Sequence, residues 1–216
     1  MRRYLRLMLL SAGMLTLASA HGEESAQPAD DAVAVTLSPA ELEAAGAIIG
    51  RIIIDRQDVF DTSDPRENKS IYRLANRWHI ETRESVIAQQ LLFQSGEQYS
   101  ARLVAETERL LRANGFLYAA TISALRFEDG VVDLRVWTRD VWTLTPGISA
   151  SRTGGENRTG VKLAESNLLG LGIALKVGYA DDVDRTSTIF AISDNNLGDS
   201  WVSAALEFVD SSDGGT

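Results

Sequence analysis

Three clustered aspartates and one glycine-rich turn are the parts of this 216-residue sequence whose types and spacing could do chemistry. Asp181, Asp182 and Asp184 could offer carboxylate oxygens to Ca²⁺, but their spacing lacks the glycine and the distal glutamate of a calcium loop. Gly170-Leu171-Gly172 has two glycines of a phosphate loop, but neither a third glycine nor a helix follows. We therefore interpret the aspartates as a solvated hairpin tip and the glycines as a turn between strands.

Catalytic chemistry has few candidate residues in this chain. There is no cysteine, and His21 and His79 are the two histidines, so thiol chemistry is excluded and a histidine-based site has almost no ligands. His79 closes a helical stretch and is expected to cap its C-terminus. No nucleophile, base and orienting group can be assembled. We expect neither an enzyme nor a metal or cofactor, and an exported hydrolase using the acidic turns is the weakest hypothesis.

The charge balance limits the partners as well. The chain has 30 acidic and 21 basic residues and a net charge of −9, which matches the phosphate backbone of nucleic acids poorly. A hydrophobic share of 44% and a charged share of 24% are typical of folded domains and argue against a disordered chain or a helical membrane protein. We expect a folded protein that binds no nucleic acid.

The N-terminus has the pattern of an export signal. Arg2-Arg3 precedes an apolar run from Leu7 to Leu17, and Ala18-Ser19-Ala20 supplies the small residues that signal peptidase recognises. The run is too short to cross the hydrocarbon of a bilayer as a helix. We predict a signal peptide over residues 1–20 that is cleaved between Ala20 and His21.

The segment after the signal peptide has the patterns of one strand and several helices, and these elements would position any functional site. Residues 21–46 predict an acidic linker and then a short helix capped by Ser38. Ile48 to Phe60 is β-branched and apolar on both alternating faces, which predicts a strand covered on both sides. Helical spacing of apolar residues appears in three later segments: Arg66 to His79, Glu84 to Phe93, and Ala101 to Asn114.

A hairpin ends this region. Ala119 to Glu128 and Val131 to Arg139 flank Asp129-Gly130, the favoured pair for a tight two-residue turn. On the second arm, apolar and polar residues alternate from Val132 to Trp137, which predicts one buried and one solvated face. The order strand, helices, strand, strand predicts a small α+β unit.

After Asp140 the helical patterns end, and strand-sized runs separated by turn residues follow. The runs that begin at Ile173 and Val202 place apolar residues on one face and small or polar residues on the other. Tyr179 and Trp201 stand near strand ends, where the aromatic girdle of a membrane barrel would place them. The alternation fits a soluble β-meander equally well, and the export signal favours the membrane.

Two groups of motifs carry a resemblance to a known family. The first comprises Glu84-Ser85-Val86-Ile87, Leu91-Leu92-Phe93-Gln94-Ser95-Gly96-Glu97, Leu110-Leu111-Arg112-Ala113-Asn114-Gly115-Phe116-Leu117 and Asp129-Gly130-Val131-Val132-Asp133. The second is the turn Glu165-Ser166-Asn167-Leu168-Leu169-Gly170-Leu171-Gly172. In this order, the two groups resemble a POTRA (polypeptide-transport-associated) domain followed by the start of a bacterial surface antigen barrel, as in the outer-membrane assembly family that includes BamA and TamA.

The resemblance implies a fold and a division of the chain. The implied fold is an α+β POTRA domain (β-α-α-β-β) over residues 47–140, followed by antiparallel strands of an incomplete outer-membrane barrel over residues 141–216. The motif residues of the barrel turn are Asn167, Leu168, Gly170 and Gly172. Barrels of this family have more strands than residues 141–216 supply, so we expect the N-terminal piece of a longer, truncated barrel.

The resemblance also implies a function. Proteins of this family assemble or translocate outer-membrane proteins, and the POTRA sheet would capture unfolded outer-membrane or secreted clients by strand addition. The implied location is the bacterial outer membrane with the POTRA domain in the periplasm. Outer-membrane lipid and other subunits of the assembly machinery are further expected partners.

Two edges of the implied sheet could bind a client: the strand Ile48 to Phe60, or an arm of the hairpin. In the strand order usual for POTRA sheets the arm Ala119 to Glu128 is an edge, and it is our preferred one. Its predicted client-binding residues are Ala119, Thr121, Ser123 and Leu125. The alternative function is a periplasmic binding module or surface antigen without insertase activity.

Overall fold

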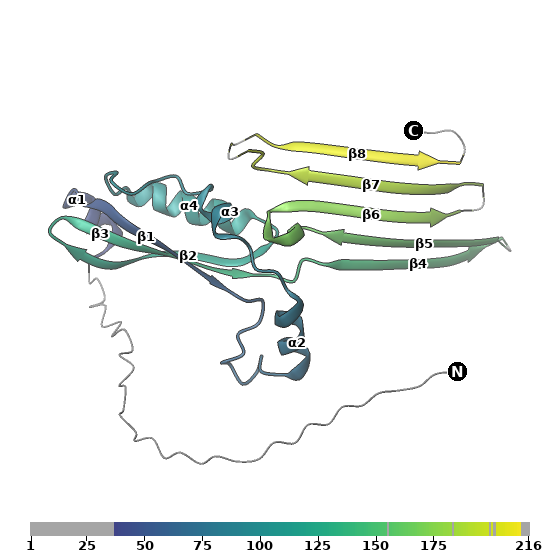
Figure 1. Cartoon of the computed structure of the whole chain (residues 1–216), viewed down its shortest axis with the longest axis horizontal. Helices are drawn as coiled ribbons and strands as arrows, with labels where there is room; N and C mark the ends of the chain where they lie inside the picture. The colour runs from purple at the N-terminus through teal and green to yellow at the C-terminus, as the bar shows by residue number, and fades with distance from the viewer. Residues whose placement is uncertain (1–36, 155, 183, 199, 201, 213–216) are drawn as a thin grey trace, which may run out of the picture. The chain divides into compact units, whose positions relative to one another are not determined.

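The computed structural model describes residues 37–154, 156–182, 184–198, 200 and 202–212 (Figure 1). The predicted signal peptide, its cleavage site at Ala20 and His21, and Trp201 lie outside the described residues. The first group of elements is α1 Pro39–Ala44, β1 Ile48–Gln57, α2 Ser70–Trp78, α3 Glu84–Ala88, α4 Ala101–Ala113, β2 Leu117–Glu128 and β3 Val131–Asp140. The second is β4 Thr145–Thr153, β5 Glu156–Glu165, the short 3₁₀ helix η1 Leu168–Gly170, β6 Ile173–Asp181, β7 Thr186–Asp194 and β8 Ala204–Ser211.

The first sheet has three strands in the order β1-β3-β2. β2 and β3 form the predicted antiparallel hairpin, and Asp129 and Gly130 both take the positive φ that a tight turn requires. β1 runs parallel to β3. Alternate β3 residues, among them Leu134 and Val136, are fully buried against side chains such as Leu111 of α4, which confirms the predicted single buried face.

The prediction that the first strand is covered on both faces was wrong. β1 ends at Gln57, and its faces differ: Ile49 is 1% exposed, whereas Ile53 is 42% exposed. Ile52 and Ile54 pack against the core, so the strand buries the face that they share. β-branched residues fill the exposed face as well, which explains why alternation was invisible in the sequence.

A bulge fixes the register between β1 and β3. The pairing shifts between Ile49 and Ile52, and the backbone N–H of Arg51 donates to Asp133 Oδ1 at 2.8 Å. The Arg51 guanidinium also donates to Asp133 Oδ2 at 2.7 and 3.1 Å. The side-chain hydrogen bonds from Arg51, and then its backbone hydrogen bond, lower the pKa of Asp133 below its ordinary value. Gly50 is required because a Cβ there would lie 2.5 Å from Asp133 Oδ1.

The helices are shorter than predicted in two of three cases. α2 begins at Ser70 rather than Arg66, because Asp61 and Asp64 accept backbone N–H groups in the preceding loop and stabilise turns there. α3 ends at Ala88 rather than near Phe93. α4 spans Ala101–Ala113, within one residue of the predicted end.

The second sheet is antiparallel throughout, with the order β4-β5-β6-β7-β8. Within the described residues β4 and β8 are its two edges, and they do not pair with each other. One face carries exposed apolar residues that are cross-strand neighbours: Ile148 with Val161 and Tyr179, and Phe190 with Phe208. None of the described helices is long and apolar enough to span a membrane.

Candidate functional site: a polar joint and the edges of the first sheet

The predicted barrel turn is held by one buried side chain, Asn167. Its Nδ2 donates to Thr82 Oγ1 at 2.8 Å, and its Oδ1 accepts the backbone N–H of Gly172 at 2.7 Å. Asn167 is 4% exposed, and Leu168 and Gly170 bound the 3₁₀ helix η1 that it precedes. The amide oxygen of Asn167 therefore closes the turn, and the amide nitrogen fastens that turn to the segment between α2 and α3.

The partner segment has its own buried polar contacts. Asp140 Oδ2, at the end of β3, accepts the backbone N–H of Thr82 at 2.7 Å and lies 2.8 Å from His79 Nε2. Both side chains of the His79–Asp140 pair are buried. The five residues His79, Thr82, Asp140, Asn167 and Gly170 form a set that we call the polar joint.

Gly170 brings two backbones together in this joint. Its carbonyl accepts the N–H of Arg83 at 2.9 Å, and its φ is +72°. A Cβ at this position would lie 2.2 Å from the carbonyl oxygen of Glu81, far inside contact distance. Only glycine permits this approach, so the glycine of the turn motif serves packing against another segment, not phosphate binding.

The side chains of the joint bind one another. The Thr82 hydroxyl is occupied by Asn167, and the His79–Asp140 pair contacts no nucleophile among the described residues. His79 is the C-cap residue of α2, as predicted, but through its backbone N–H to Ala75; its ring binds Asp140 instead. The described residues contain no group of three ligands that could hold a metal ion, and Asp182 lies 2.7 Å from Arg158.

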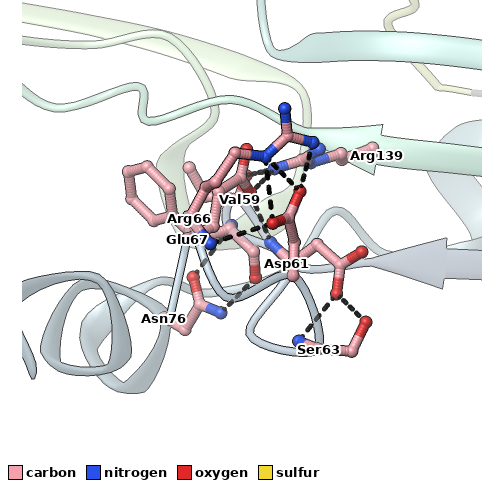
Figure 2. Close-up of polar contacts among 9 residues, drawn as sticks. Val59, Asp61, Ser63, Arg66, Glu67, Asn76 and Arg139 are labelled. Atoms are coloured by element: carbon pink, nitrogen blue, oxygen red, sulfur yellow. Dashed lines mark hydrogen bonds and ion pairs between the residues drawn. The ribbon is translucent and has the colours of Figure 1, made fainter. Parts of the chain in front are cut away.

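A second polar cluster fastens the loop before α2. Figure 2 shows Arg139 reaching the carbonyl of Val59, which accepts from Nε at 3.0 Å and from Nη2 at 2.8 Å, and the carboxylate of Glu67. Asn76 of α2 exchanges two hydrogen bonds with the backbone of Phe60, at 2.8 and 3.1 Å. These contacts anchor α2 by one of its faces to the end of the first sheet.

The predicted client-binding arm is an edge strand, β2, but its outer side is occupied. Arg112 of α4 donates to the carbonyl of Ala120 at 2.8 Å, and Glu108 accepts the N–H of Ile122 at 2.6 Å. Backbone groups alternate in direction along a strand, so those of Ala119, Thr121 and Ser123 point toward β3, and Leu125 lies at a bulge. The residues predicted for client binding are therefore not those that direct backbone groups outward.

The other edge, β1, is covered along its first residues only. Gly96 and Glu97 exchange backbone hydrogen bonds with Ile49, at 2.8 Å in both directions. From Ile52 to Gln57, β1 pairs with β3 on one side, and no described strand pairs along the other side. Among the described residues, the outer backbone groups of this segment have no hydrogen-bond partner, unlike those at the centre of β2.

These features can be compared with known proteins. No protein-family model and no curated protein matches the chain. Among solved structures, BamA from Haemophilus ducreyi lacking POTRA domains 1–3 aligns at a TM-score of 0.50 and 17% identity, over 74% of this chain and 27% of that one. The chain has a BamA-like fold. CdiB from Acinetobacter baumannii aligns at a TM-score of 0.41 and 12% identity, over 69% of this chain and 25% of that one.

Within this BamA-like fold, the sequence motif led to two of the five residues of the polar joint. Asn167 and Gly170 were singled out as a turn, whereas Thr82 and Asp140 were missed and His79 was assigned to capping alone. Thr82 and Asn167 are 85 positions apart, and His79 and Asp140 are 61 apart. Single polar residues at such separations leave no periodic signal.

Proposed function

We propose that this chain is part of an outer-membrane protein assembly or translocation component. In this proposal β4 to β8 lie in the outer membrane, and residues 47–140 form a periplasmic POTRA domain that captures unfolded clients by strand addition and passes them to the barrel. The clients are outer-membrane or secreted proteins, and other assembly subunits are expected partners. We also propose that the protein catalyses no covalent reaction and needs no cofactor.

The exposed apolar face of the second sheet supports the membrane location. Side chains such as Ile148 and Phe208 would be costly on a water-facing sheet, but they match the lipid-facing residues of a barrel. Gly147 and Gly178 lie beside Lys162 in the register, and the Lys162 side chain covers Gly147. The face with Lys162 thus carries mostly small and polar residues, as expected for a lumen, although the same row continues into Ile189 and Val209. The BamA-like fold agrees with this arrangement.

The observation that carries the client-binding proposal is the open edge of β1 from Ile52 to Gln57. An extended client could add there, and its backbone would supply hydrogen bonds that depend little on client sequence. Strand addition at the centre of β2 would instead have to displace Glu108 and Arg112 of α4. We therefore propose β1 as the client edge, in place of β2, the hairpin arm that the sequence analysis favoured.

Site-specific crosslinking tests this choice. A photoreactive amino acid would replace Ile53 on β1, Thr121 on β2, or Ala105 on the exposed side of α4. With an unfolded barrel peptide, we expect strong crosslinking from position 53, weak crosslinking from 121 and background from 105. Exposed side chains stand at all three positions, so circular dichroism should show each variant folded.

The client backbone provides a second control. A peptide N-methylated at alternate residues keeps its side chains but loses the donors of one strand edge, so its crosslinking at position 53 should fall to background. Undiminished crosslinking of the methylated peptide would contradict strand addition. Crosslinking from 121 that exceeds that from 53 would restore β2 as the client edge.

Opening β2 should create a second client edge. In the double substitution Glu108→Leu and Arg112→Leu, the carbonyl of Ala120 and the N–H of Ile122 lose their side-chain partners. We expect crosslinking from position 121 to rise several-fold toward the level at 53. The matched control is Glu106→Leu with Arg109→Leu, which removes a neighbouring exposed ion pair of α4. A rise in both double variants would show that loosening α4 in general, not freeing these two groups, is responsible.

A further inference from the structure

Helix α2 exposes its apolar side chains to solvent. Ile71, Leu74 and Trp78 follow one another at spacings of three and four and so share one face, and they are 62%, 45% and 74% exposed. Another face, with Tyr72 and Asn76, holds the helix in place: the Tyr72 ring stacks on Phe60 at a centroid distance of 4.3 Å. The helix is thus anchored with its apolar face outward, the reverse of the usual arrangement in a globular domain.

Basic residues line the same helix. Lys69, Arg73 and Arg77 recur at a spacing of four, and α2 contains no acidic residue, although the whole chain has a net charge of −9. None of the three forms an ion pair with another described residue. An apolar face that carries tryptophan beside a basic row is the pattern of a helix that lies in the plane of an anionic lipid surface.

The end of α2 is fixed near the point where the chain passes into the second sheet. His79, which caps α2, is hydrogen-bonded to Asp140, and β4 begins at Thr145. Trp142 and Leu144, between the two sheets in sequence, are also exposed. If β4 to β8 span the membrane, the boundary of the bilayer lies close to Thr145, within reach of the exposed face of α2.

We propose that α2 is an interfacial anchor that binds anionic phospholipid on the membrane surface next to the barrel. Ile71, Leu74 and Trp78 insert below the headgroups, and Arg73 and Arg77 contact lipid phosphates. This inference rests on the proposed location of β4 to β8 in the outer membrane. A nine-residue helix buries too little area to hold a free protein on a membrane; its role is to orient a domain that the barrel already tethers.

The absence of cysteine makes a direct test possible, because a single introduced cysteine is labelled uniquely. The 216-residue chain carrying Ile71→Cys, Val161→Cys or Ala105→Cys would be labelled with an environment-sensitive fluorophore and refolded into vesicles. The vesicles contain phosphatidylcholine alone or phosphatidylcholine with phosphatidylglycerol. Position 161 reports insertion of the second sheet, position 71 reports α2, and position 105 is a control on α4. We expect blue-shifted emission at 161 in both vesicles, at 71 with phosphatidylglycerol, and at 105 in neither.

The basic row is tested by Arg73→Gln with Arg77→Gln in the chain labelled at position 71. Each cationic side chain near an anionic surface changes partitioning by about fivefold, so the preference for phosphatidylglycerol should fall by on the order of tenfold or more. Arg102→Gln with Arg109→Gln removes the same charge from α4 and should leave the preference unchanged.

The labels separate the two proposals. Emission that shifts at 161 but not at 71 would overturn the lipid anchor and leave the membrane location of the second sheet intact. No shift at either position would refute the membrane location and the anchor with it. A shift at 71 that needs no lipid and grows with protein concentration would assign the apolar face to a second copy of the chain, and would also overturn the anchor.

Discussion

Gly170→Ala is expected to break the polar joint and to cost at least about 3 kcal/mol of stability. The positive φ of +72° alone costs an alanine roughly 1–2 kcal/mol. The Cβ would also lie 2.2 Å from the Glu81 carbonyl oxygen, so one backbone has to move. That movement breaks the hydrogen bond from Arg83 to Gly170 and strains the bond from Asn167 to Thr82.

Gly154→Ala is the matched control for this substitution. Gly154 has a similar φ of +64°, but a Cβ there meets no atom within 4 Å, so it carries the conformational cost without the clash. Hydrogen–deuterium exchange of peptides spanning residues 80–84 would report the joint directly, and urea unfolding in detergent would report stability. Equal losses for the two alanine variants, with unchanged exchange at Arg83, would show that the close approach is unimportant.

Asp140→Ala is expected to destabilise the protein by about 2–6 kcal/mol, because it leaves two buried groups without their acceptor, at about 1–3 kcal/mol each. The backbone N–H of Thr82 and the His79 ring both lose Asp140 Oδ2. Asp140→Asn retains one acceptor oxygen and should fall between wild type and alanine. The contacts of Asp140 lie where α2 ends, so loss of the carboxylate should also free the C-terminal end of that helix.

Asp64→Ala provides the comparison at the surface. Asp64 pairs with Arg66, whose side chain is largely exposed, and accepts the backbone N–H of the same residue. Solvent screens both contacts, so this substitution should cost much less stability than the loss of Asp140. Chemical unfolding of the three aspartate variants, followed by tryptophan fluorescence, would rank them. A loss for Asp140→Ala no greater than that for Asp64→Ala would mean that water replaces the carboxylate and that the joint is more open than its burial indicates.

Local signals in the sequence predicted much of the first sheet. Asp129-Gly130 between two alternating arms specified the hairpin because this pair accepts positive φ at both turn positions. Ser38 and Glu41 form the predicted capping box at α1. The alternation from Val132 to Trp137 correctly gave the buried face of β3. Each of these features depends on residues that are close together in the chain.

The features that the sequence did not predict depend on distant residues. The closure of β2 by α4 and the polar joint both join segments far apart in the chain. The outward apolar face of α2 was also missed, because its apolar residues have the same three- and four-residue spacing as those of a helix that packs on a core. Only the position of Tyr72 and Asn76 against Phe60 shows which face is inward.

The contacts of α4 with β2 bear on how copies of the protein could associate. A three-stranded sheet with two free edges can add a neighbour on each side, so its copies can stack into a continuous ribbon. Glu108 and Arg112 already satisfy the outward groups at the centre of β2, which leaves β1 as the pairing edge. If two copies pair through β1, neither has a second free edge to which a third copy could add. Any self-association through this sheet would therefore be expected to stop at a dimer instead of growing into a polymer.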